Sequence, residues 1–378
     1  MNKTRVKCIV CGNTDLPVLF EKDKAFPIGN FPVEKGYPCQ FIPYNVQICQ
    51  KCQTAQLKYE GNLDLIYGNN HARAYGSLRN EMDRLFVDFI TESGETHFIE
   101  IGAGSGSLAN ELIIRTRGKY IVVDPSYWGE TDHRVVVPKY VEEVDLSSFK
   151  IPNVIMSHVF EHFYEPSRIL EILAASDIQN VYLNFPNLEY CIKEGVNYVL
   201  TPEHSFYIST TNLAYLFLKH GYIMKKIQYY NDYAVFFHFS KSSKIKADDN
   251  SIDESGFFGE TKKDVRNFYN ILNERIWKCK RVISAERKGM IPLYIFPCSI
   301  HPLFLFAFGL DCKIFNNVLD NNPHKIGKFL YGTNLECLSF NETIRTPERK
   351  IILLVGGQFN QEVKSKAEEN PNNIVFSV

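Results

Sequence analysis

Residues 98–106 read Phe98-Ile-Glu-Ile-Gly-Ala-Gly-Ser-Gly106, a short apolar run that ends in three closely spaced glycines. The pattern of residues 107–115, SLANELIIR, is typical of a helix that follows directly. Small residues in such a turn let the backbone approach a ligand closely. A strand, a glycine turn and a helix in this order predict the first unit of a parallel α/β sheet. The turn residues expected to touch a cofactor are Gly102, Gly104, Ser105 and Gly106.

Acidic residues lie near the ends of successive predicted strands. Glu100 lies inside its strand end, where a carboxylate can hold the amino group of a methionine moiety or a turn amide. Asp124 follows 24 residues later at the end of KYIVVD, where it can accept both hydroxyls of a ribose. Asp145, before the next strand, could meet an adenine amino group. These positions favour S-adenosylmethionine as cofactor and are typical of class I methyltransferases.

Two other interpretations of the glycine turn stay open. Dinucleotide-binding enzymes carry a similar turn, but theirs reads GxGxxG, whereas this one reads GxGxG. The glycines could also mark only tight strand–helix corners, although acidic residues would then stand at successive strand ends by coincidence.

The pattern along the chain predicts an α/β protein with three domains. Residues 71–245 alternate helical segments with apolar runs such as NVIMSHV and NVYLNF, which indicates a mostly parallel sheet. The polar stretch 240–256 is expected to be a linker or surface loop. A long amphipathic helix over roughly 260–289 follows, and the runs IPLYIF, KIFNNVLD and KIILLVGG predict a second Rossmann-like unit within 256–378.

Composition narrows the class of partner. The chain has 378 residues with 42 Lys and Arg against 43 Asp and Glu, so its net charge of -1 gives no field that would attract nucleic acid or an anionic membrane. No apolar run reaches the length of about 18 residues that a membrane helix needs. The opening MNKTRVKCIVCG lacks the apolar stretch of a signal peptide. We therefore expect a cytoplasmic enzyme, as a monomer or small homo-oligomer.

Residues 1–70 contain two CxxC pairs, Cys8 with Cys11 and Cys49 with Cys52. This spacing lets two thiolates of one tight turn hold the same ion, and four thiolates complete a tetrahedral Zn²⁺ site. Such a saturated site is structural, because it leaves no position for water. Four reduced thiols in a small core, or a redox pair, are the alternatives, and the loop-rich segment favours zinc.

With these motifs in place, the chain resembles the C-methyltransferases that act on nucleotide-linked ketosugars. That family combines a four-cysteine zinc module, a class I methyltransferase core and a C-terminal Rossmann-like domain with a DNNPxKxGxxxxGT-like run, here Asp320–Thr333. The resemblance implies that Glu203 and His204 lie at the sugar ring, with His204 as general base. It also implies that His162 and Tyr75 are active-site residues. Apart from the resemblance, His158 could line the cofactor pocket or be only a buried histidine at a strand end.

The chain departs from the family pattern at three places. Thr201 stands where a tyrosine is often found, the serine-rich stretch after Tyr75 is reduced to Gly76-Ser77, and residues 296–302 replace a glycine-rich turn. These departures affect the acceptor more than the reaction. O-methylation of a sugar hydroxyl therefore remains an alternative, as does a non-catalytic protein that binds S-adenosylmethionine or serves as a scaffold.

Overall fold

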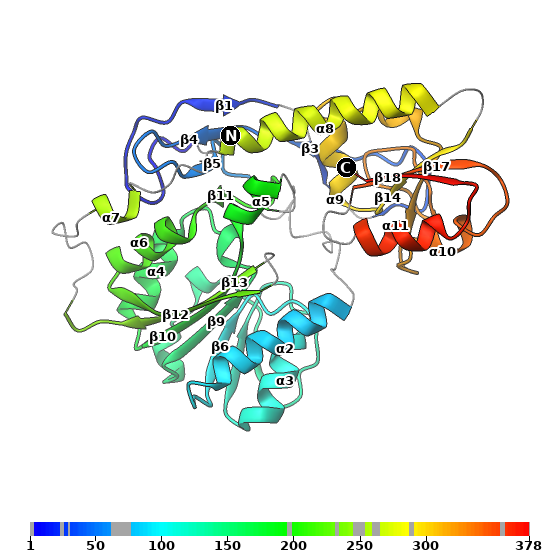
Figure 1. The fold of residues 1–378 in the computed structure, drawn as a ribbon. Helices are drawn as coiled ribbons and strands as arrows, with labels where there is room; N and C mark the ends of the chain where they lie inside the picture. The colour runs from blue at the N-terminus through cyan, green and yellow to red at the C-terminus, as the bar shows by residue number, and fades with distance from the viewer. Residues whose placement is uncertain are drawn as a thin grey trace.

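The computed structural model describes residues 4–22, 26–28, 31–61, 77–194, 199–230, 234–244, 254–258, 265–286, 291–355 and 360–377 (Figure 1). Tyr75 and Gly76 lie outside the described residues.

The middle of the chain forms a seven-stranded sheet within this described part, in the order β12-β13-β10-β9-β6-β7-β8. Its strands are β6 (Phe98–Ile101), β7 (Tyr120–Val123), β8 (Val135–Val137), β9 (Asn153–Ser157), β10 (Asn180–Pro186), β12 (Tyr222–Tyr230) and β13 (Ala234–Lys241). The strands are parallel except β13, which runs antiparallel to both neighbours. Numbered by appearance, the order is 3-2-1-4-5-7-6, a Rossmann-like arrangement whose switch point lies between β6 and β9.

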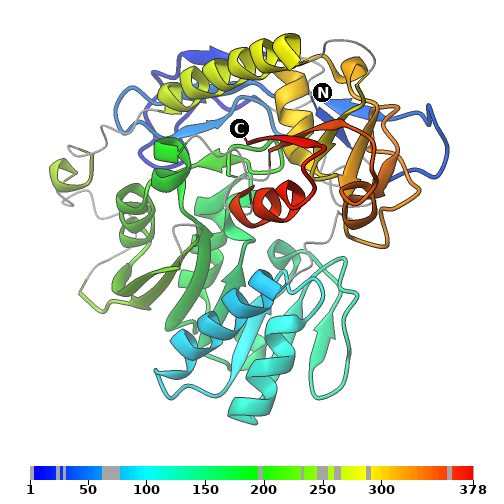
Figure 2. The ribbon, with the colours of Figure 1, turned by 45° about the vertical axis from the view of Figure 1, so that its right-hand side comes forward.

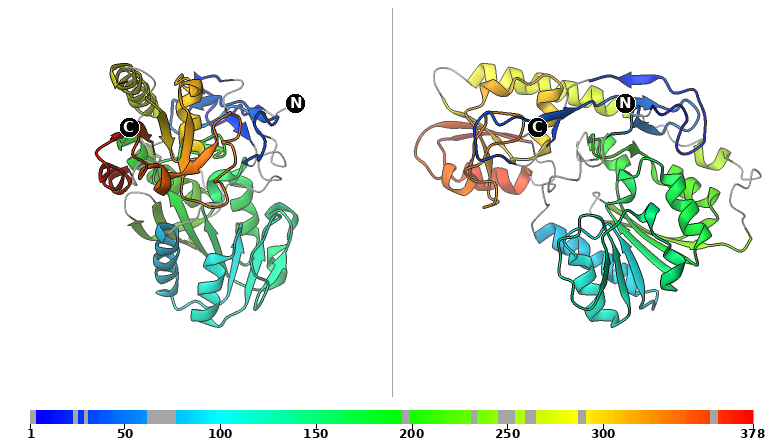
Figure 3. Two further views of the ribbon diagram at one scale, coloured as in Figure 1. Left: turned by 90° about the vertical axis from the view of Figure 1, so that its right-hand side faces the viewer. Right: turned by 180° about the vertical axis from the view of Figure 1, so that it is seen from behind.

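Helices cover both faces of this main sheet (Figure 3). They are α2 (Ser77–Thr91), α3 (Ser107–Thr116), α4 (Pro166–Ala175) and α6 (Thr210–Lys219). Helix α5 (Leu188–Glu194), which follows β10, packs instead in the core that the N-terminal and C-terminal segments share. Alternate residues of β6 serve the two faces, with Phe98 packed among α2 and α3 and Ile99 among α4 and α6. The central strands are buried on both sides, which explains their mainly apolar sequences. The predicted α/β class is confirmed.

The N-terminal segment forms a small antiparallel sheet in the order β1-β4-β5-β11 and a separate hairpin of β2 with β3. These strands are β1 (Val18–Phe20), β2 (Phe26–Ile28), β3 (Gln40–Ile42), β4 (Val46–Ile48), β5 (Ala55–Leu57) and β11 (Phe206–Tyr207). Strand β11 comes from the region after α5, so the small sheet incorporates a piece of the middle of the chain. Figure 2 shows the N-terminal strands beside both the main core and the C-terminal unit.

The C-terminal unit contains a parallel sheet in the order β16-β15-β14-β17-β18. Its strands are β14 (Leu293–Phe296), β15 (Asn317–Asp320), β16 (Cys337–Ser339), β17 (Lys350–Leu354) and β18 (Asn373–Ser377). Numbered by appearance, this order is 3-2-1-4-5, again Rossmann-like. The described helices outside the main core are α7 (Ser255–Phe258), α8 (Val265–Glu286), α9 (Ile300–Ala307), α10 (Phe340–Thr343) and α11 (Asn360–Glu368).

Helix α8 joins the N-terminal and C-terminal parts into one hydrophobic core (Figure 1). Phe26 and Tyr44 contact Phe304 of α9 with ring centroids 5.2 and 5.8 Å apart. The Tyr44 hydroxyl lies 3.0 Å from that of Tyr269 in α8. Aromatic packing of this kind contributes more than the buried area alone. In the part of the chain that the structure covers, no helix has the length and apolarity needed to cross a bilayer.

Candidate active site

The glycine turn after β6 combines close packing with open space. Gly102 has a φ of 72°, and a Cβ there would lie 2.5 Å from Val159 Cγ2. Gly104 has a φ of 55°, and a Cβ there would meet nothing within 4 Å. The positive φ disfavours a side chain at both positions. A side chain at Gly102 would also clash with Val159, whereas Gly104 borders free space. The turn can therefore receive a ligand at Gly104.

Asp124 ends β7 beside this turn and is held by two backbone amides. The amide of Gly104 donates to Oδ2 and the amide of Ser126 donates to Oδ1, both at 2.7 Å. Each carboxylate oxygen keeps a further lone pair, so Asp124 can still accept hydroxyl hydrogens. An amide of this turn was expected as one possible partner of Glu100, but the Gly104 amide does not take that role. It donates to Asp124 instead.

Glu100 is 2% exposed in the middle of the main sheet, and its Oε2 accepts a hydrogen bond from the Tyr120 hydroxyl at 2.8 Å. Burial, together with the nearby carboxylates of Asp83 and Asp124, raises the pKa of Glu100 to about 7. Repulsion between neighbouring carboxylates is relieved by a cationic ligand. A molecule with an ammonium or sulfonium group meets that requirement.

Asp145 lies at the surface, in the connection between β8 and β9. Its Oδ1 accepts hydrogen bonds from the Ser147 amide at 3.1 Å and the Ser147 hydroxyl at 2.6 Å. The carboxylate thus caps the short helix at Leu146–Phe149. A contact with adenine stays a prediction for this residue.

Two Glu-His pairs face each other beyond the end of β9. Glu161 and His162 belong to the short helix at Phe160–His162, while Glu203 and His204 lie just before β11. The Ser205 amide donates to the Glu161 carbonyl at 2.9 Å, and His162 Nδ1 lies 3.1 Å from the Glu203 carbonyl. The two imidazole centroids are 4.9 Å apart. Backbone contacts therefore hold the two pairs together.

The hydrogen bonds of these imidazoles fix which nitrogen carries the proton. A carbonyl only accepts, so His162 Nδ1 donates to Glu203, and His204 Nδ1 donates to the Val199 carbonyl at 2.6 Å. Burial lowers the pKa of His162 to about 4 and also lowers the pKa of His204. Both rings are neutral near pH 7, and Nε2 of each offers a lone pair.

Glu161 is a site residue that we did not predict. It is 1% exposed, and neither carboxylate oxygen has a hydrogen-bond donor among the described residues. Its Oε1 lies 3.3 Å from His158 Nδ1 and 4.0 Å from His204 Nε2. The repeated Glu-His dipeptide was the available signal, but no local pattern shows that this carboxylate points inward.

His158 follows β9 directly and has a φ of 54°, which is uncommon for a residue with a side chain. Its amide donates to the Asn184 carbonyl of β10 at 2.9 Å. Strained backbone at the end of a central strand often accompanies a functional site. The structure brings His158 to Glu161 and, through Val159, to the glycine turn.

Arg5 fixes the segment that carries His204. Its buried guanidinium donates to the Ser205 carbonyl at 2.5 Å and the Ser205 hydroxyl at 3.1 Å, and it also bonds the Tyr164 carbonyl. Strand β11, which follows Ser205, pairs with β5 of the N-terminal sheet. The N-terminal segment therefore positions the second Glu-His pair.

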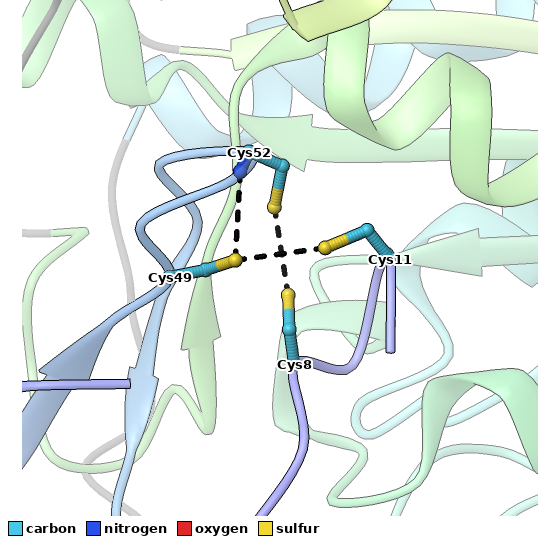
Figure 4. Close-up of side chains that lie close together, drawn as sticks. All are labelled: Cys8, Cys11, Cys49 and Cys52. Carbon is cyan, nitrogen blue, oxygen red and sulfur yellow. Dashed lines mark hydrogen bonds between the residues drawn. The ribbon is translucent and has the colours of Figure 1, made fainter. Parts of the chain in front are cut away.

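The four predicted zinc ligands meet at one point (Figure 4). Sγ of Cys8 lies 3.5 Å from that of Cys52, and Sγ of Cys11 lies 3.5 Å from that of Cys49. Zn–S bonds of about 2.3 Å place tetrahedral sulfurs about 3.8 Å apart, close to these distances. The side chains therefore fit a Zn²⁺ ion, which would need little rearrangement.

The DNNP-like run begins at the carboxyl end of β15 in the C-terminal sheet. Lys325 Nζ donates to Asp320 Oδ2 at 2.9 Å and to the Cys298 carbonyl at 2.7 Å. Cys298 belongs to the segment 296–302 that departs from the family pattern. The lysine thus connects the ends of β14 and β15.

No family model matches the sequence, and no curated protein proved similar to it. Methyltransferases and a biosynthetic protein are among the solved structures that resemble part of this chain. Magnesium protoporphyrin IX methyltransferase of Synechocystis PCC 6803, with bound SAH, shares 14% identity over 45% of this chain and 90% of its own, with a TM-score of 0.35. Human N-acetylserotonin methyltransferase, in complex with SAM, shares 14% identity over 43% of this chain and 52% of its own, with a TM-score of 0.36.

The pyocyanin biosynthetic protein PhzM shares 13% identity over 47% of this chain and 64% of its own, with a TM-score of 0.37. These similarities concern less than half of the chain and transfer no residue roles. The main sheet itself, with its order 3-2-1-4-5-7-6, has the Rossmann-like arrangement of a class I methyltransferase fold.

Proposed function

We propose that this chain is an S-adenosylmethionine-dependent methyltransferase that methylates a carbon atom of a nucleotide-linked ketosugar. One observation carries the proposal. Gly102 of the cofactor turn packs directly on Val159, which lies between His158 and Glu161. The expected cofactor turn and the histidine cluster are therefore parts of one site at the carboxyl edge of β6 and β9, where ligands bind in open α/β sheets.

The cofactor supplies an electrophilic methyl group on a positively charged sulfur. Asp124 would accept the ribose hydroxyls, and its two amide contacts already hold the carboxylate in place. Glu100 would supply negative charge toward the amino group. Gly104 leaves room for the ligand because no side chain fills the space beside it.

A carbon acceptor must first lose a proton, because carbon is nucleophilic only as an enolate. A 4-keto group makes the neighbouring C3 proton acidic, and the Nε2 lone pair of His204 is available to take it. The imidazolium that forms would face Glu161, whose Oε1 is 4.0 Å away, so the carboxylate would stabilise it. Glu203 would bond a sugar hydroxyl.

His162 has a narrower role than the sequence suggested. Both His162 and Tyr75 were expected as active-site residues, and a hydrogen-bond donor to the developing oxyanion is the role that such a residue could take. In its neutral form His162 has its proton on Nδ1, directed at Glu203, so Nε2 cannot donate. We therefore assign His162 to holding the Glu203 segment, and Tyr75, outside the described residues, remains the expected donor.

In this proposal each of the three predicted segments has its own role. Residues 71–245 would carry methyl transfer, 256–378 would contribute to nucleotide-sugar binding, and 1–70 would hold structural zinc. Support for the last role comes from the thiol geometry and from the pairing of β5 with β11.

Cofactor binding is tested by calorimetry with S-adenosylhomocysteine. The wild-type chain should bind it, and Asp124→Ala should weaken binding at least about 10-fold through loss of the ribose contacts. Glu142 is an exposed carboxylate in the short helix that follows β8, and Glu142→Gln should bind the ligand as wild type does. No binding to wild type at millimolar ligand would remove methyl transfer altogether.

The acceptor is tested with a nucleotide-linked 4-ketosugar deuterated at C3. Loss of deuterium together with a new carbon-bound methyl group supports the proposal, and His204→Gln should abolish both. Turnover of sugars without a keto group would instead favour O-methylation. Binding of the cofactor without any turnover would favour a non-catalytic role.

A further inference from the structure

We propose that Glu161, His162 and His204 form a binding site for a divalent transition-metal ion, separate from the four-cysteine site. One ligand atom from each of these three residues lies within 4.8 Å of the other two. The inference rests on their side-chain geometry and does not require the proposed methyl transfer. It also goes beyond that function, which assigns no metal to this position.

The buried carboxylate is the first argument. Glu161 is almost fully enclosed, and the described residues supply no hydrogen-bond donor to either oxygen. An isolated buried carboxylate is costly, and buried charges in proteins are paired or coordinate metal ions. Its near neighbours are imidazoles rather than lysine or arginine, with His158 Nδ1 at 3.3 Å and His204 Nε2 at 4.0 Å.

The outer hydrogen bonds of the two histidines are the second argument. Metal-binding histidines almost always donate their other ring N–H to a carbonyl or carboxylate, which fixes the tautomer and the ring orientation. His162 donates from Nδ1 to the Glu203 carbonyl, and His204 donates from Nδ1 to the Val199 carbonyl. Both acceptors are backbone atoms of the same segment, and both rings keep Nε2 unprotonated. This is the state in which imidazole binds a metal.

The donor set indicates the kind of ion. Imidazole nitrogen suits Zn²⁺, Co²⁺, Fe²⁺ and Ni²⁺ better than Mg²⁺ or Ca²⁺, and three protein ligands leave a position open. Bonds of about 2.1 Å place ligand atoms about 3.4 Å apart. The ligand atoms lie within 4.8 Å of one another, and the 4.0 Å between Glu161 Oε1 and His204 Nε2 must shorten by about 0.6 Å, so metal binding requires side-chain rotation.

Occupancy would exclude the base role proposed above. Nε2 of His204 has one lone pair, which cannot hold a metal ion and accept a proton together. If both proposals hold, the ion-bound chain should bind cofactor but not remove the C3 proton. Metal binding itself is measured without turnover, so the two proposals can fail independently.

The test is a Co²⁺ titration of the full chain with zinc retained in the four-cysteine site, followed by absorption and calorimetry. We expect one Co²⁺ per chain, with weak visible bands and no thiolate-to-cobalt band in the near ultraviolet. Absence of binding, or a thiolate band that shows exchange into the cysteine site, would overturn the proposal. Binding of S-adenosylhomocysteine, measured on the same sample, reports separately on the proposed function.

Variants locate the ion. Glu161→Gln and His204→Gln should each weaken Co²⁺ binding at least about 10-fold, since a ligand is lost. The matched control is Glu165→Gln, an exposed carboxylate four residues further along the same segment, which should bind as wild type does. Equal affinity in all four proteins would contradict the assignment.

The wild-type chain alone provides a readout if a variant does not fold. Pulsed electron paramagnetic resonance of one bound Cu²⁺ should show the nitrogen modulation of coordinated imidazole. A spectrum without imidazole nitrogen would refute the site.

Discussion

Glu100 shows how one buried side chain gives the site its charge preference. The strand β6 is covered on both faces, so an acidic residue within it has little access to water. Burial and two neighbouring carboxylates raise its pKa to about 7, and the Tyr120 hydroxyl is its hydrogen-bond partner. The residue is therefore partly protonated near neutral pH and loses its proton most readily when a cation is bound.

This raised pKa predicts a pH-dependent stability. The folded chain holds the Glu100 proton up to pH of about 7, whereas the unfolded chain releases it near the ordinary value of 4.5. The free energy of unfolding should therefore fall as the pH rises between these values, by up to about 3 kcal/mol, and then level off. Urea unfolding at pH 5 and pH 8 measures the change. Glu100→Gln should lack this fall in the free energy of unfolding. The same pH dependence in both proteins would contradict the raised pKa of Glu100.

Gly102 and Gly104 provide a matched pair of substitutions. Gly104→Ala should cost about 1 kcal/mol of stability, because alanine is strained at positive φ. It should also weaken S-adenosylhomocysteine binding, since the new methyl group enters the free space beside the turn. Gly102→Ala adds a clash with Val159 and should cost about 3 kcal/mol or more. Thermal unfolding and calorimetry separate these effects, and normal ligand binding by Gly104→Ala would place the ligand elsewhere.

Strand β11 is the element that connects the small sheet to the histidine cluster. It is only two residues long, but it pairs with β5 and follows His204 and Ser205 directly. Its position depends on contacts at both ends, with Arg5 on Ser205 and the Tyr207 hydroxyl on the Thr201 carbonyl at 2.7 Å. Thr201 stands where the family pattern often has a tyrosine, and its carbonyl accepts a hydrogen bond from the phenol of Tyr207.

Arg5 provides the test at this level. Arg5→Lys loses the forked donor geometry that reaches Ser205 and Tyr164 together, and hydrogen bonds from charged groups contribute about 1.5–3 kcal/mol. We expect a loss of stability of that order and a slower methyl transfer, with unchanged affinity for S-adenosylhomocysteine. Lys7→Ala, an exposed cation two residues away, is the control. A variant with weakened cofactor binding and normal turnover would contradict this role.

In the whole molecule, the four clustered cysteines support the main core as well as the N-terminal segment. Cys8, Cys49 and Cys52 pack in the same hydrophobic cluster as residues of β6 and β9. Asn212 of α6 donates to the Cys52 carbonyl at 2.7 Å. Loss of the ion should therefore disturb the methyl-acceptor side of the site, which the small sheet positions.

Cys8→Ser tests this coupling. It should remove zinc, lower the free energy of unfolding by at least about 2 kcal/mol and reduce methyl transfer more than cofactor affinity. Cys39→Ser, which lies outside the four-cysteine cluster, should keep its zinc and its stability. Metal analysis, thermal unfolding and calorimetry provide the readouts. Full zinc content in Cys8→Ser would show that another residue set holds the ion.

The sequence predicted the main sheet well because its central strands are buried on both faces. Runs such as NVIMS and NVYLNF are therefore mainly apolar, and they form β9 and β10. The predicted long helix is also present, with Val265–Glu286 described within the expected range 260–289. Four apolar residues at helical spacing predicted this helix, and Phe268, Leu272 and Ile276 are buried whereas Ile271 is half-buried.

Other parts of the site depend on contacts that no local pattern contains. The pairing of Phe206 with Gln56 joins segments far apart in the sequence, and two residues are too few to show a strand period. The inward position of Glu161 depends on β11 and Arg5, so the dipeptide alone could not distinguish it from a surface acid. Residues 1–70 were expected as a separate module, whereas Phe26 and Tyr44 pack with Phe304 in one core.

This shared core has a consequence for synthesis on the ribosome. Phe26 and Tyr44 emerge early, but Tyr269 and Phe304, which cover them, emerge only after the main sheet. The early segment must therefore keep apolar surface exposed while most of the chain is translated, a condition that favours aggregation and chaperone binding. The main sheet can complete its own packing first, and the N-terminal segment then closes onto the last third of the chain.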